Sequence, residues 1–204
     1  MKVLIACEYS GIVRDAFTKK GHNAWSCDIL PTESEGNHYQ GDVLNYLDEG
    51  WDMMIAHPPC TYLTIAGNRW FNEEKYGDKA RERKQLRVKA AEFFKKLLNA
   101  NIPKICVENP VGYINTNYKK PNQIIHPCYF GDEDNKRTAL WLKNLPTLKH
   151  TKYVEPKIYG YFKSGKKKGQ PIYFCDWQGW HKNRGKIRSK FWQGIANAMA
   201  NQWG

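Results

Sequence analysis

The sequence predicts an α/β fold built on a mostly parallel sheet with helices on both faces. Apolar, strand-like runs alternate with amphipathic helical segments over the first two thirds of the chain, and this alternation is typical of parallel sheets whose strands are joined by helices. Polar and reactive residues follow directly after the apolar runs. Because ligands gather at the carboxyl ends of the strands in such Rossmann-like sheets, we expect a functional site along one edge.

The first half of the chain supplies three predicted strands. Residues 2–8 (KVLIACE), 23–30 (NAWSCDIL) and 51–57 (WDMMIAH) are short apolar runs bounded by polar or turn residues. Residues 10–21 place apolar side chains at helical spacing and end in a glycine that can close a helix. Between the second and third strands, residues 41–47 (GDVLNYL) predict a turn leading into a short element.

The second half contains the clearest helix, predicted over residues 79–100. Its apolar side chains form one stripe, with charged residues around the rest of the surface. The residues of this stripe are Leu86, Ala90, Phe93, Phe94, Leu97 and Leu98. Two further strands are predicted at residues 104–110 (KICVENP) and 138–145 (TALWLKNL), and a closing helix at residues 190–203.

Composition limits the class of protein. The chain has 204 residues, of which 41% are hydrophobic and 25% charged, as is typical of a soluble domain of ordinary size. No apolar run approaches the ~18 residues of a membrane-spanning helix, so we expect a cytoplasmic protein with no membrane partner. The six cysteines form no CxxC pair, which predicts neither a disulfide framework nor a metal site.

Positive charge is concentrated near the C-terminus. Residues 149–190 contain twelve Lys and Arg residues and only two acids, Glu155 and Asp176, so this segment carries most of the net charge of +12. Aromatic residues, Trp180 among them, are interleaved with the basic ones. Basic residues neutralise phosphates and aromatic rings stack on bases, so we expect the segment to bind nucleic acid. The alternative is a solvated basic region around a small aromatic core.

Several residues at predicted strand ends outline an adenosine-type cofactor pocket. Glu8, Ser10 and Gly11 follow the first strand, where a tight turn would offer the N–H groups of a helix N-terminus to a carboxylate or phosphate. Asp28 ends the second strand, where nucleoside-binding sheets place an acid for the ribose hydroxyls, and Asp42 could accept from an adenine amine. Each has an ordinary alternative as a turn or helix cap. The lack of a glycine-rich phosphate loop argues against a dinucleotide or ATP.

The segment HPPCTYL presents a cysteine on a stiff turn. Two prolines stop the strand because they cannot donate backbone hydrogen bonds, and Cys60 follows them. A thiolate is a nucleophile when nearby positive charge favours it, and Glu108, at the next predicted strand end, suits an acid that protonates or hydrogen-bonds a substrate. With an adenosine-type pocket, the pair suggests that the thiolate adds to carbon 6 of a pyrimidine, the acid engages ring nitrogen 3, and carbon 5 attacks an activated methyl group.

In order and over nearly the whole chain, these motifs resemble those of the DNA cytosine-5 methyltransferases. CEYSGIV is similar to the first cofactor loop, CDIL to the segment with the ribose-binding acid, and GDV to the segment with the adenine-side acid. HPPCTYL resembles the Pro-Cys nucleophile loop, VENP the Glu-Asn-Val motif, and QGIANAM the C-terminal Ile-Gly-Asn-Ala helix that packs against the cofactor. A closer resemblance, to small phage-encoded members of this family, is carried by CEYSG, HPPCTYL, ENP, HPCYFGDEDNKRTALWLKNLP and GIANAMANQWG.

The resemblance implies a Rossmann-like enzyme that uses S-adenosylmethionine, with Cys60 as nucleophile and Glu108 and Asn109 as further catalytic residues. The residues that we expect at the cofactor are Glu8, Ser10, Gly11, Asp28, Asp42, Pro58 and Asn197. Those that we expect at the substrate are Lys136, Arg137, Lys166, Lys167, Lys168 and Arg188. A phage-encoded enzyme of this kind would act on DNA in the host cytoplasm, in the setting of restriction and modification.

The same resemblance predicts three segments: a catalytic core at residues 1–148, the basic segment 149–190, and a C-terminal helix at 191–204 that packs back on the core. The basic segment stands where the family has a large target-recognition domain. The first loop lacks the family's Phe-x-Gly-x-Gly, and the Gln-x-Arg-x-Arg motif is replaced by NKRTALWL. Duplex DNA, which requires base flipping, single-stranded DNA and a free cytosine nucleotide therefore all stay open as substrates.

Two other functions are compatible with the sequence. Amino-methyltransferases carry an Asp/Asn-Pro-Pro-aromatic loop, and HPPC shares its prolines but neither its polar residue nor its aromatic one. A methyltransferase fold kept as a catalytically inactive DNA-binding or anti-restriction protein would explain the altered first loop, whereas the presence of Cys60 and Glu108 argues against it.

Overall fold

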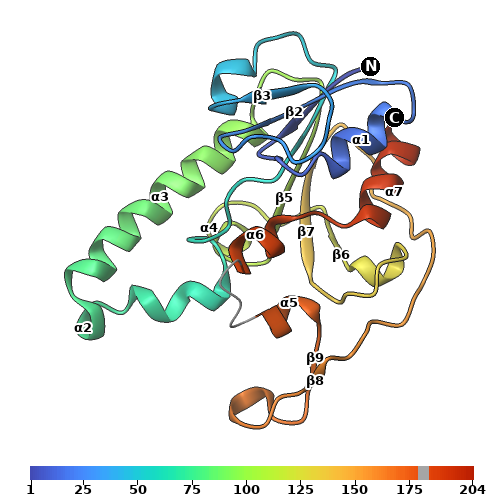
Figure 1. The fold of residues 1–204 in the computed structure, drawn as a ribbon. Coiled ribbons are helices and arrows are strands. Elements are labelled where there is room, and N and C mark those ends of the chain that lie inside the picture. Colours follow the sequence, from blue (N-terminus) through green and yellow to red (C-terminus); the bar gives the residue numbers. More distant parts are fainter. Residues whose placement is uncertain (179–183) are drawn as a thin grey trace.

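A computed structural model of the chain describes residues 1–178 and 184–204, and Trp180 lies outside these residues. Its main feature is a seven-stranded sheet with the strand order β3-β2-β1-β4-β5-β7-β6, in which only β7 is antiparallel to its neighbours (Figure 1). The strands are β1 (Lys2–Ala6), β2 (Asn23–Asp28), β3 (His38–Gln40), β4 (Met53–Ala56), β5 (Lys104–Pro110), β6 (Gln123–Ile125) and β7 (Thr138–Lys143). The predicted α/β fold with a mostly parallel, Rossmann-like sheet is confirmed.

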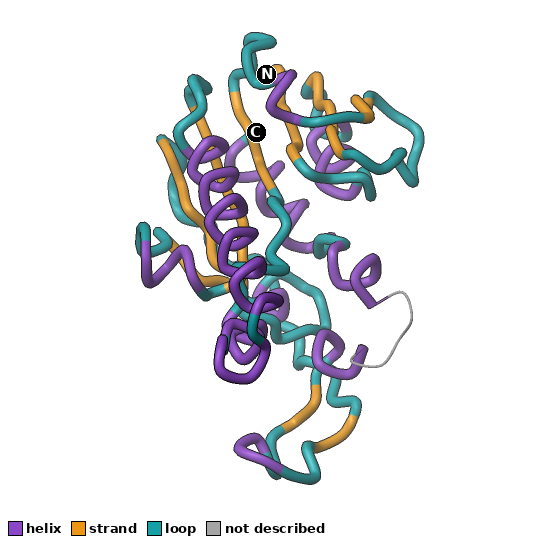
Figure 2. The backbone as a smooth tube through the Cα atoms, turned by 90° about the vertical axis from the view of Figure 1, so that its left-hand side faces the viewer, coloured by secondary structure: helices purple, strands orange, loops and turns teal. Residues whose placement is uncertain are grey.

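Seven α-helices and four short 3₁₀ segments lie among the described residues. The helices are α1 (Ile12–Thr18), α2 (Glu73–Tyr76), α3 (Asp78–Leu98), α4 (Tyr113–Asn117), α5 (Phe174–Trp177), α6 (Arg184–Ser189) and α7 (Gln193–Trp203). The 3₁₀ segments are η1 (Val43–Tyr46), η2 (Ile65–Phe71), η3 (Pro127–Tyr129) and η4 (Gly165–Lys167). A two-stranded hairpin of β8 (Gly160–Tyr161) and β9 (Pro171–Ile172) projects from the sheet and its helices (Figures 1 and 2).

Helices cover both faces of the sheet, as the alternating pattern predicts. Alternate strand residues point to opposite faces, so Ile5 packs with α1 and α7 on one side, while Leu4 packs with α3 on the other. On the α3 side, Phe94 meets Trp141 of β7 edge to face, with ring centroids 5.0 Å apart. Burial of such large rings dominates core energetics. The C-terminal helix α7 lies along α1 (Figure 1).

The predicted stripe of the long helix is buried only in its second half. Phe94, Leu97 and Leu98 are buried against the sheet, whereas Leu86 is only half-buried. The first half of α3 extends past the sheet and meets η2 and α2 instead (Figure 1). A 21-residue helix is ~32 Å long, which exceeds the length of the central strands, so its outer half must find another partner.

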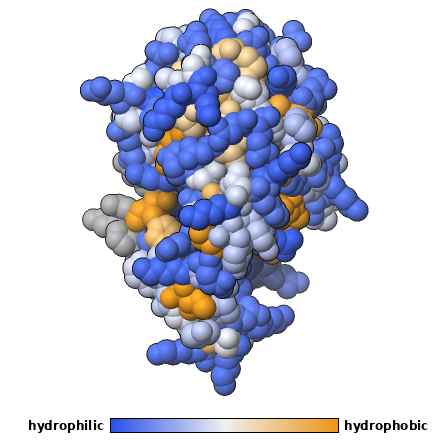
Figure 3. All heavy atoms as spheres, turned by 90° about the vertical axis from the view of Figure 1, so that its right-hand side faces the viewer, coloured by the Kyte–Doolittle hydropathy of each residue, from blue (hydrophilic) through white to orange (hydrophobic). Residues whose placement is uncertain are grey.

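The short edge strands β3 and β6 were not among the predicted elements. Each has three residues, too few for an alternating pattern to stand out. None of the described helices is long and apolar enough to cross a membrane. Hydrophilic residues predominate on the face seen in Figure 3, including its projecting end.

Candidate active site

Four neighbouring strands end in one row of chemically active residues. The register pairs Ala6 of β1 with Cys27 of β2 and with Ala56 of β4. Ala56 in turn pairs with Val107 of β5. The residues that come next along β2, β1, β4 and β5 are Asp28, Cys7, His57 and Glu108. The polar strand ends therefore meet at one edge of the sheet, as the sequence predicts.

The Pro-Pro turn after β4 is tied to the end of β5. Asn109 is buried, and its side-chain amide donates a hydrogen bond of 2.9 Å to the backbone oxygen of Pro58. The turn then continues through Cys60, whose backbone oxygen accepts from the N–H groups of Leu63 and Thr64. Asn109 thus acts in this structure as a positioning residue for the Cys60 turn. Pro58, which we expected at the cofactor, is buried, and its backbone oxygen is the acceptor of this hydrogen bond.

Glu108 lies beside a histidine that the sequence marks only as a neighbour of Cys60. His57 Nδ1 is 3.5 Å from Glu108 Oε2, and both side chains are about nine-tenths buried. Burial alone would raise the pKa of Glu108, but His57 and the charge of Lys136 outweigh it and hold this pKa below its ordinary value. Both ring nitrogens of His57 and Oε1 of Glu108 have no hydrogen-bond partner among the described residues. The pair is therefore buried and keeps unused hydrogen-bonding capacity.

Cys60 is surrounded by charges of both signs. Burial raises the pKa of the Cys60 thiol; Lys136 and Arg188 lower it, Glu108 raises it, and the net result is a pKa above that of an exposed cysteine. Lys136 is held by a cation–π contact, with its Nζ 4.7 Å from the centre of the Trp192 ring. The structure thus brings Cys60, Glu108, Lys136 and Arg188 into one electrostatic cluster. The thiol is therefore protonated at neutral pH, and the thiolate forms only when a further positive charge or a base stabilises it.

The segment from α6 to the start of α7 crosses this edge of the sheet. Ser189 Oγ lies 2.9 Å from the hydroxyl of Tyr9 in the β1–α1 turn. The next residue, Lys190, forms an ion pair of 2.7 Å with Glu33. Phe191 then packs on the ring of His57, with centroids 4.5 Å apart. Consecutive residues of one segment therefore contact both the β1–β2 side of the edge and the Glu108 side.

On the β2 side, two carboxylates keep acceptor capacity. Asp28 Oδ1 accepts from the N–H of Leu30, and Asp42 Oδ1 accepts from the N–H of Leu44, so each acid makes the local turn named as its ordinary alternative. The second oxygen of each accepts no hydrogen bond from the described residues. Both acids raise the pKa of Cys7 beyond the effect of its burial. Ile29, beside Asp28, is 75% exposed and adds an apolar surface.

The N-terminus of α1 is not open to an anion, contrary to the expectation for this turn. The buried Glu8 carboxylate accepts from the N–H groups of Val13 (2.7 Å) and Arg14 (3.2 Å). Burial raises the pKa of Glu8, and these two N–H groups and His57 only partly offset the effect. Glu8 therefore caps the N-terminus of α1, and Ser10 Oγ, 3.3 Å away, donates to the same carboxylate.

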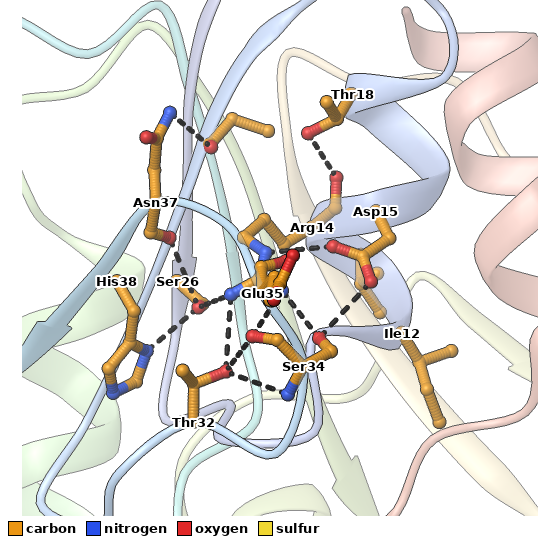
Figure 4. A network of polar contacts seen from close by, with 12 residues as sticks. Ile12, Arg14, Asp15, Thr18, Ser26, Thr32, Ser34, Glu35, Asn37 and His38 are labelled. Carbon is orange, nitrogen blue, oxygen red and sulfur yellow. Dashed lines mark hydrogen bonds and ion pairs between the residues drawn. The ribbon is translucent and has the colours of Figure 1, made fainter.

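A buried arginine also encloses the β1–α1 turn. Arg14 is 1% exposed, and its guanidinium holds the loop of residues 32–36 across the turn (Figure 4). Its other partners are Asp15 and Ser26. Gly11 has φ +76°, and a Cβ built there would lie 2.0 Å from the hydroxyl of Ser34. The sequence gives no signal for this network, because an arginine in an amphipathic helix is normally a surface residue.

No hydrogen bond or ion pair joins the remaining predicted residues to Cys60 within the part of the chain that the structure describes. Asn197 is exposed and lines a shallow groove with Lys19 at the end of α1; α1 runs away from the β1–α1 turn, so the structure does not bring Asn197 to the strand-end row. Arg137 is exposed and directly precedes β7. Residues 166–168 lie at the tip of the β8–β9 hairpin (Figure 1). Lys167 forms an ion pair of 3.7 Å with Asp176 there.

Asp132 is a structural residue that sequence reasoning missed. Its Oδ2 accepts from the N–H of Gly194 at 3.0 Å and so caps the start of α7. A Cβ at Gly194 would lie 2.0 Å from the backbone oxygen of Phe130, so only glycine allows this close approach. The acid and the glycine are 62 positions apart in the sequence, and no local pattern links them.

No family model and no curated protein matches the sequence. Among solved structures, the chain is similar to a protein described as a DNA modification methyltransferase encoded within an Escherichia coli prophage, at 14% identity and a TM-score of 0.40, covering 70% of this chain and 46% of that one. It is similar to the Entamoeba histolytica methyltransferase EhMeth at 13% identity and a TM-score of 0.47 (76% and 57%), and to the Schizosaccharomyces pombe Dnmt2 methyltransferase at 13% and 0.44 (87% and 59%). The chain therefore spans about half of the length of these structures, and the likeness concerns fold alone.

Proposed function

We propose that this chain is a DNA cytosine-5 methyltransferase that transfers a methyl group from S-adenosylmethionine to carbon 5 of cytosine through a covalent Cys60 adduct. One observation supports the proposal: a cysteine on a fixed turn after β4 and a buried carboxyl group in the adjacent parallel strand β5 lie in one cluster with two cations. Addition of a thiolate to a pyrimidine ring needs both groups at once. DNA, as a polyanion, is the substrate that the positive surface charge favours.

The residues on the β1–β2 side fit the adenosine part of the cofactor. Asp28 and Asp42 each keep a carboxylate oxygen for ribose or adenine donors, and Ile29 offers an exposed apolar surface for a flat ring. The N-terminus of α1 does not fit an anionic group, because Glu8 already occupies its N–H groups. When bound, S-adenosylmethionine would supply an electrophilic methyl group, and its sulfonium charge suits an acidic surrounding.

Cys60 forms and then breaks the covalent bond in this mechanism. The thiol loses its proton to solvent, and Lys136 and Arg188 favour the resulting thiolate against the cost of burial. The sulfur bonds to carbon 6 of cytosine while ring nitrogen 3 takes up a proton, and carbon 5 then takes up the methyl group. Loss of the carbon-5 proton to water forms the carbon 5–carbon 6 double bond and expels the sulfur as thiolate, and ring nitrogen 3 returns its proton. Asn109 holds the turn in place throughout, because its amide is bonded to the backbone of Pro58.

Glu108, with His57 beside it, binds the edge of the base that carries ring nitrogen 3 and the exocyclic amine. The depressed pKa of Glu108 makes it a carboxylate in the free protein, so it accepts a hydrogen bond from the exocyclic amine of cytosine. As the sulfur adds, ring nitrogen 3 becomes basic and takes up a proton. Glu108 relays this proton from solvent to the ring nitrogen, and His57, with its Nδ1 3.5 Å from Oε2, holds the carboxylate in place. Glu108 thus contacts the base directly, whereas His57 acts through it.

The closed N-terminus of α1 favours a second candidate function. A methyltransferase fold whose first loop cannot take the anionic end of a cofactor would still bind DNA through its basic surface. In that case the chain would be an inactive DNA-binding protein, and the Cys60 cluster would be a remnant. The two functions differ in one measurable property, the transfer of label to a base.

The deciding experiment incubates the protein with labelled S-adenosylmethionine and separate samples of duplex DNA, single-stranded DNA, RNA and deoxycytidine monophosphate. Nucleoside mass spectrometry then locates the label. We expect 5-methylcytosine with the wild type and with Cys128→Ser, none with Cys60→Ser, and retained cofactor binding in all three. A fully active Cys60→Ser variant would rule out the covalent route, and a wild type that binds DNA without transferring label would support the inactive protein.

A further inference from the structure

A groove lies between the outer half of α3 and the η2–α2 segment, on the continuation of the Cys60 turn. Its volume is about 600 Å³, which lies within the range of small-molecule sites. The lining residues are Tyr62, Trp70, Tyr76, Lys79, Glu82, Arg83 and Leu86. None of these residues belongs to the predicted catalytic, cofactor-binding or substrate-binding sets, so the groove calls for an explanation of its own.

Three aromatic rings face this groove and none of them is buried. Trp70 is 42% exposed, and Tyr62 and Tyr76 are half-buried. The rings of Trp70 and Tyr76 lie at 46° with centroids 5.1 Å apart, and the Arg69 guanidinium lies 4.7 Å from the centre of the Trp70 ring. An exposed tryptophan held by a cation is a ready stacking surface, because the ring is already oriented and loses little entropy on binding.

The groove also carries positive charge. Lys79 and Arg83 line it, and Arg83 Nε is buried with no hydrogen-bond acceptor among the described residues. Glu82 is the single acid in the lining. Over residues 69–87 the sequence has seven Lys and Arg residues against four acids. Glu73, one of these acids, already forms ion pairs with two cations of α3. The charge left over favours an anionic ligand.

Two arginines of α3 join the groove to the Cys60 turn. Arg83 Nη2 donates to the backbone oxygen of Thr61 at 3.2 Å, and Arg87 Nε donates to that of Tyr62 at 2.9 Å. Their guanidinium groups also lie over the ring of Phe71 in η2, 5.1 Å and 3.3 Å from its centre. The residues that directly follow Cys60 therefore form one wall of the groove, and the groove and the turn are a single packed unit.

We propose that this groove binds unpaired nucleobases of a single-stranded nucleic acid, with Trp70 and Tyr62 stacking on the bases and Lys79 and Arg83 neutralising the phosphates. Stacking on aromatic rings needs a free base face, and in a duplex those faces are covered by neighbouring bases. Each of the three rings already has a cation over it, and an acidic peptide would satisfy these cations without using the ring surface that stays exposed. This binding is argued from the groove alone and does not depend on methyl transfer. Only the suggestion that the same strand also reaches Cys60 rests on the proposed function.

The test measures affinity rather than methyl transfer, so that it can fail independently of the proposed chemistry. Labelled single-stranded DNA of about 12 nucleotides, close to the known range of site sizes, and a duplex of equal length are titrated with the full-length protein by fluorescence anisotropy. Trp70→Ala removes the stacking ring, and Trp70→Phe keeps an aromatic face. Tyr118→Ala is the matched control, since Tyr118 is 39% exposed and also lies under a lysine, Lys95, outside the groove.

We expect Trp70→Ala to bind the single strand roughly fivefold to 150-fold more weakly than the wild type, since stacking contributes about 1–3 kcal/mol per base. Trp70→Phe should recover most of the affinity, and Tyr118→Ala should match the wild type. Lys79→Ala should reduce the salt dependence by about 0.7 per lost phosphate contact. Equal single-strand affinities for Trp70→Ala and the wild type, or an equal loss in Tyr118→Ala, would overturn the proposal, whatever else the groove accepts.

Discussion

Replacing His57 by phenylalanine should reverse the way stability depends on pH. In the wild type the pKa of Glu108 lies below its ordinary value, so the folded state binds fewer protons than the unfolded state and stability rises with pH through that range. Without His57 only Lys136 opposes burial, which is the largest influence on this carboxyl. The pKa of Glu108 then rises, and the variant loses stability as pH increases from the ordinary value to the raised one.

The magnitude follows from the burial of the pair. Both side chains are about nine-tenths buried, and removing one partner of such a pair costs about 3–5 kcal/mol; because Lys136 remains, we expect a cost near 3 kcal/mol at neutral pH. At low pH Glu108 is protonated in both proteins, and only repacking against Phe191 differs. Each unit by which the pKa rises adds about 1.4 kcal/mol, so the gap should widen as pH rises above the ordinary pKa of a glutamate.

Urea unfolding at a series of pH values measures this gap. His150→Phe is the control for the ring change, because that exposed ring also packs on an aromatic residue (Tyr129, 4.5 Å) but forms no ion pair with an acid among the described residues. His57 also lowers the pKa of Glu8, so the double variant His57→Phe/Glu108→Gln, compared with Glu108→Gln alone, isolates the Glu8 share. Parallel pH profiles for the wild type and His57→Phe would refute the assignment of the pair.

Two further predictions concern the α1 turn and the hairpin. Gly11→Ala should destabilise the fold by about 3 kcal/mol, because the new methyl group would clash with the covering loop. Gly21→Ala has a similar φ of +81° but nothing within 4 Å, so it should cost only the ~1 kcal/mol of a left-handed backbone. Equal losses of stability for the two variants in thermal unfolding would show that the loop of residues 32–36 does not restrict position 11. Alanine at all three positions 166–168 should weaken DNA binding and lower its salt slope, and an unchanged slope would move the DNA surface away from the hairpin.

The sequence predicts the row of strand ends better than it predicts the contacts between them. An apolar run that stops at Asp28 or Glu108 marks the end of a strand, and parallel strands then align those ends. The contact between His57 and Glu108 depends on β4 and β5 being neighbours, although a long helix separates them in the chain. No local pattern carries that information, so the sequence pairs Glu108 with Cys60 but does not indicate His57 as its partner.

Two regions differ from what helical periodicity indicates, for a common physical reason. By periodicity alone, Arg14 lies on the polar side of the helix predicted at residues 10–21, and Leu86 lies on the apolar side of the helix predicted at residues 79–100. Arg14 is buried because the loop of residues 32–36 folds over it, and Leu86 lines a groove because α3 outruns the sheet. Periodicity states which side of a helix is apolar, but only tertiary structure decides what covers that side.

The charges along the sheet edge are divided in a way that separates the two proposed ligands. Glu8, Asp28 and Asp42 lie on the β1–β2 side, whereas Lys136 and Arg188 lie around Cys60. A sulfonium donor is a cation and DNA is a polyanion, so each is attracted to a different half and repelled by the other. A methyl group passed between them has to cross where the halves meet. The His57–Glu108 pair stands at that boundary, and its charge state therefore affects both halves.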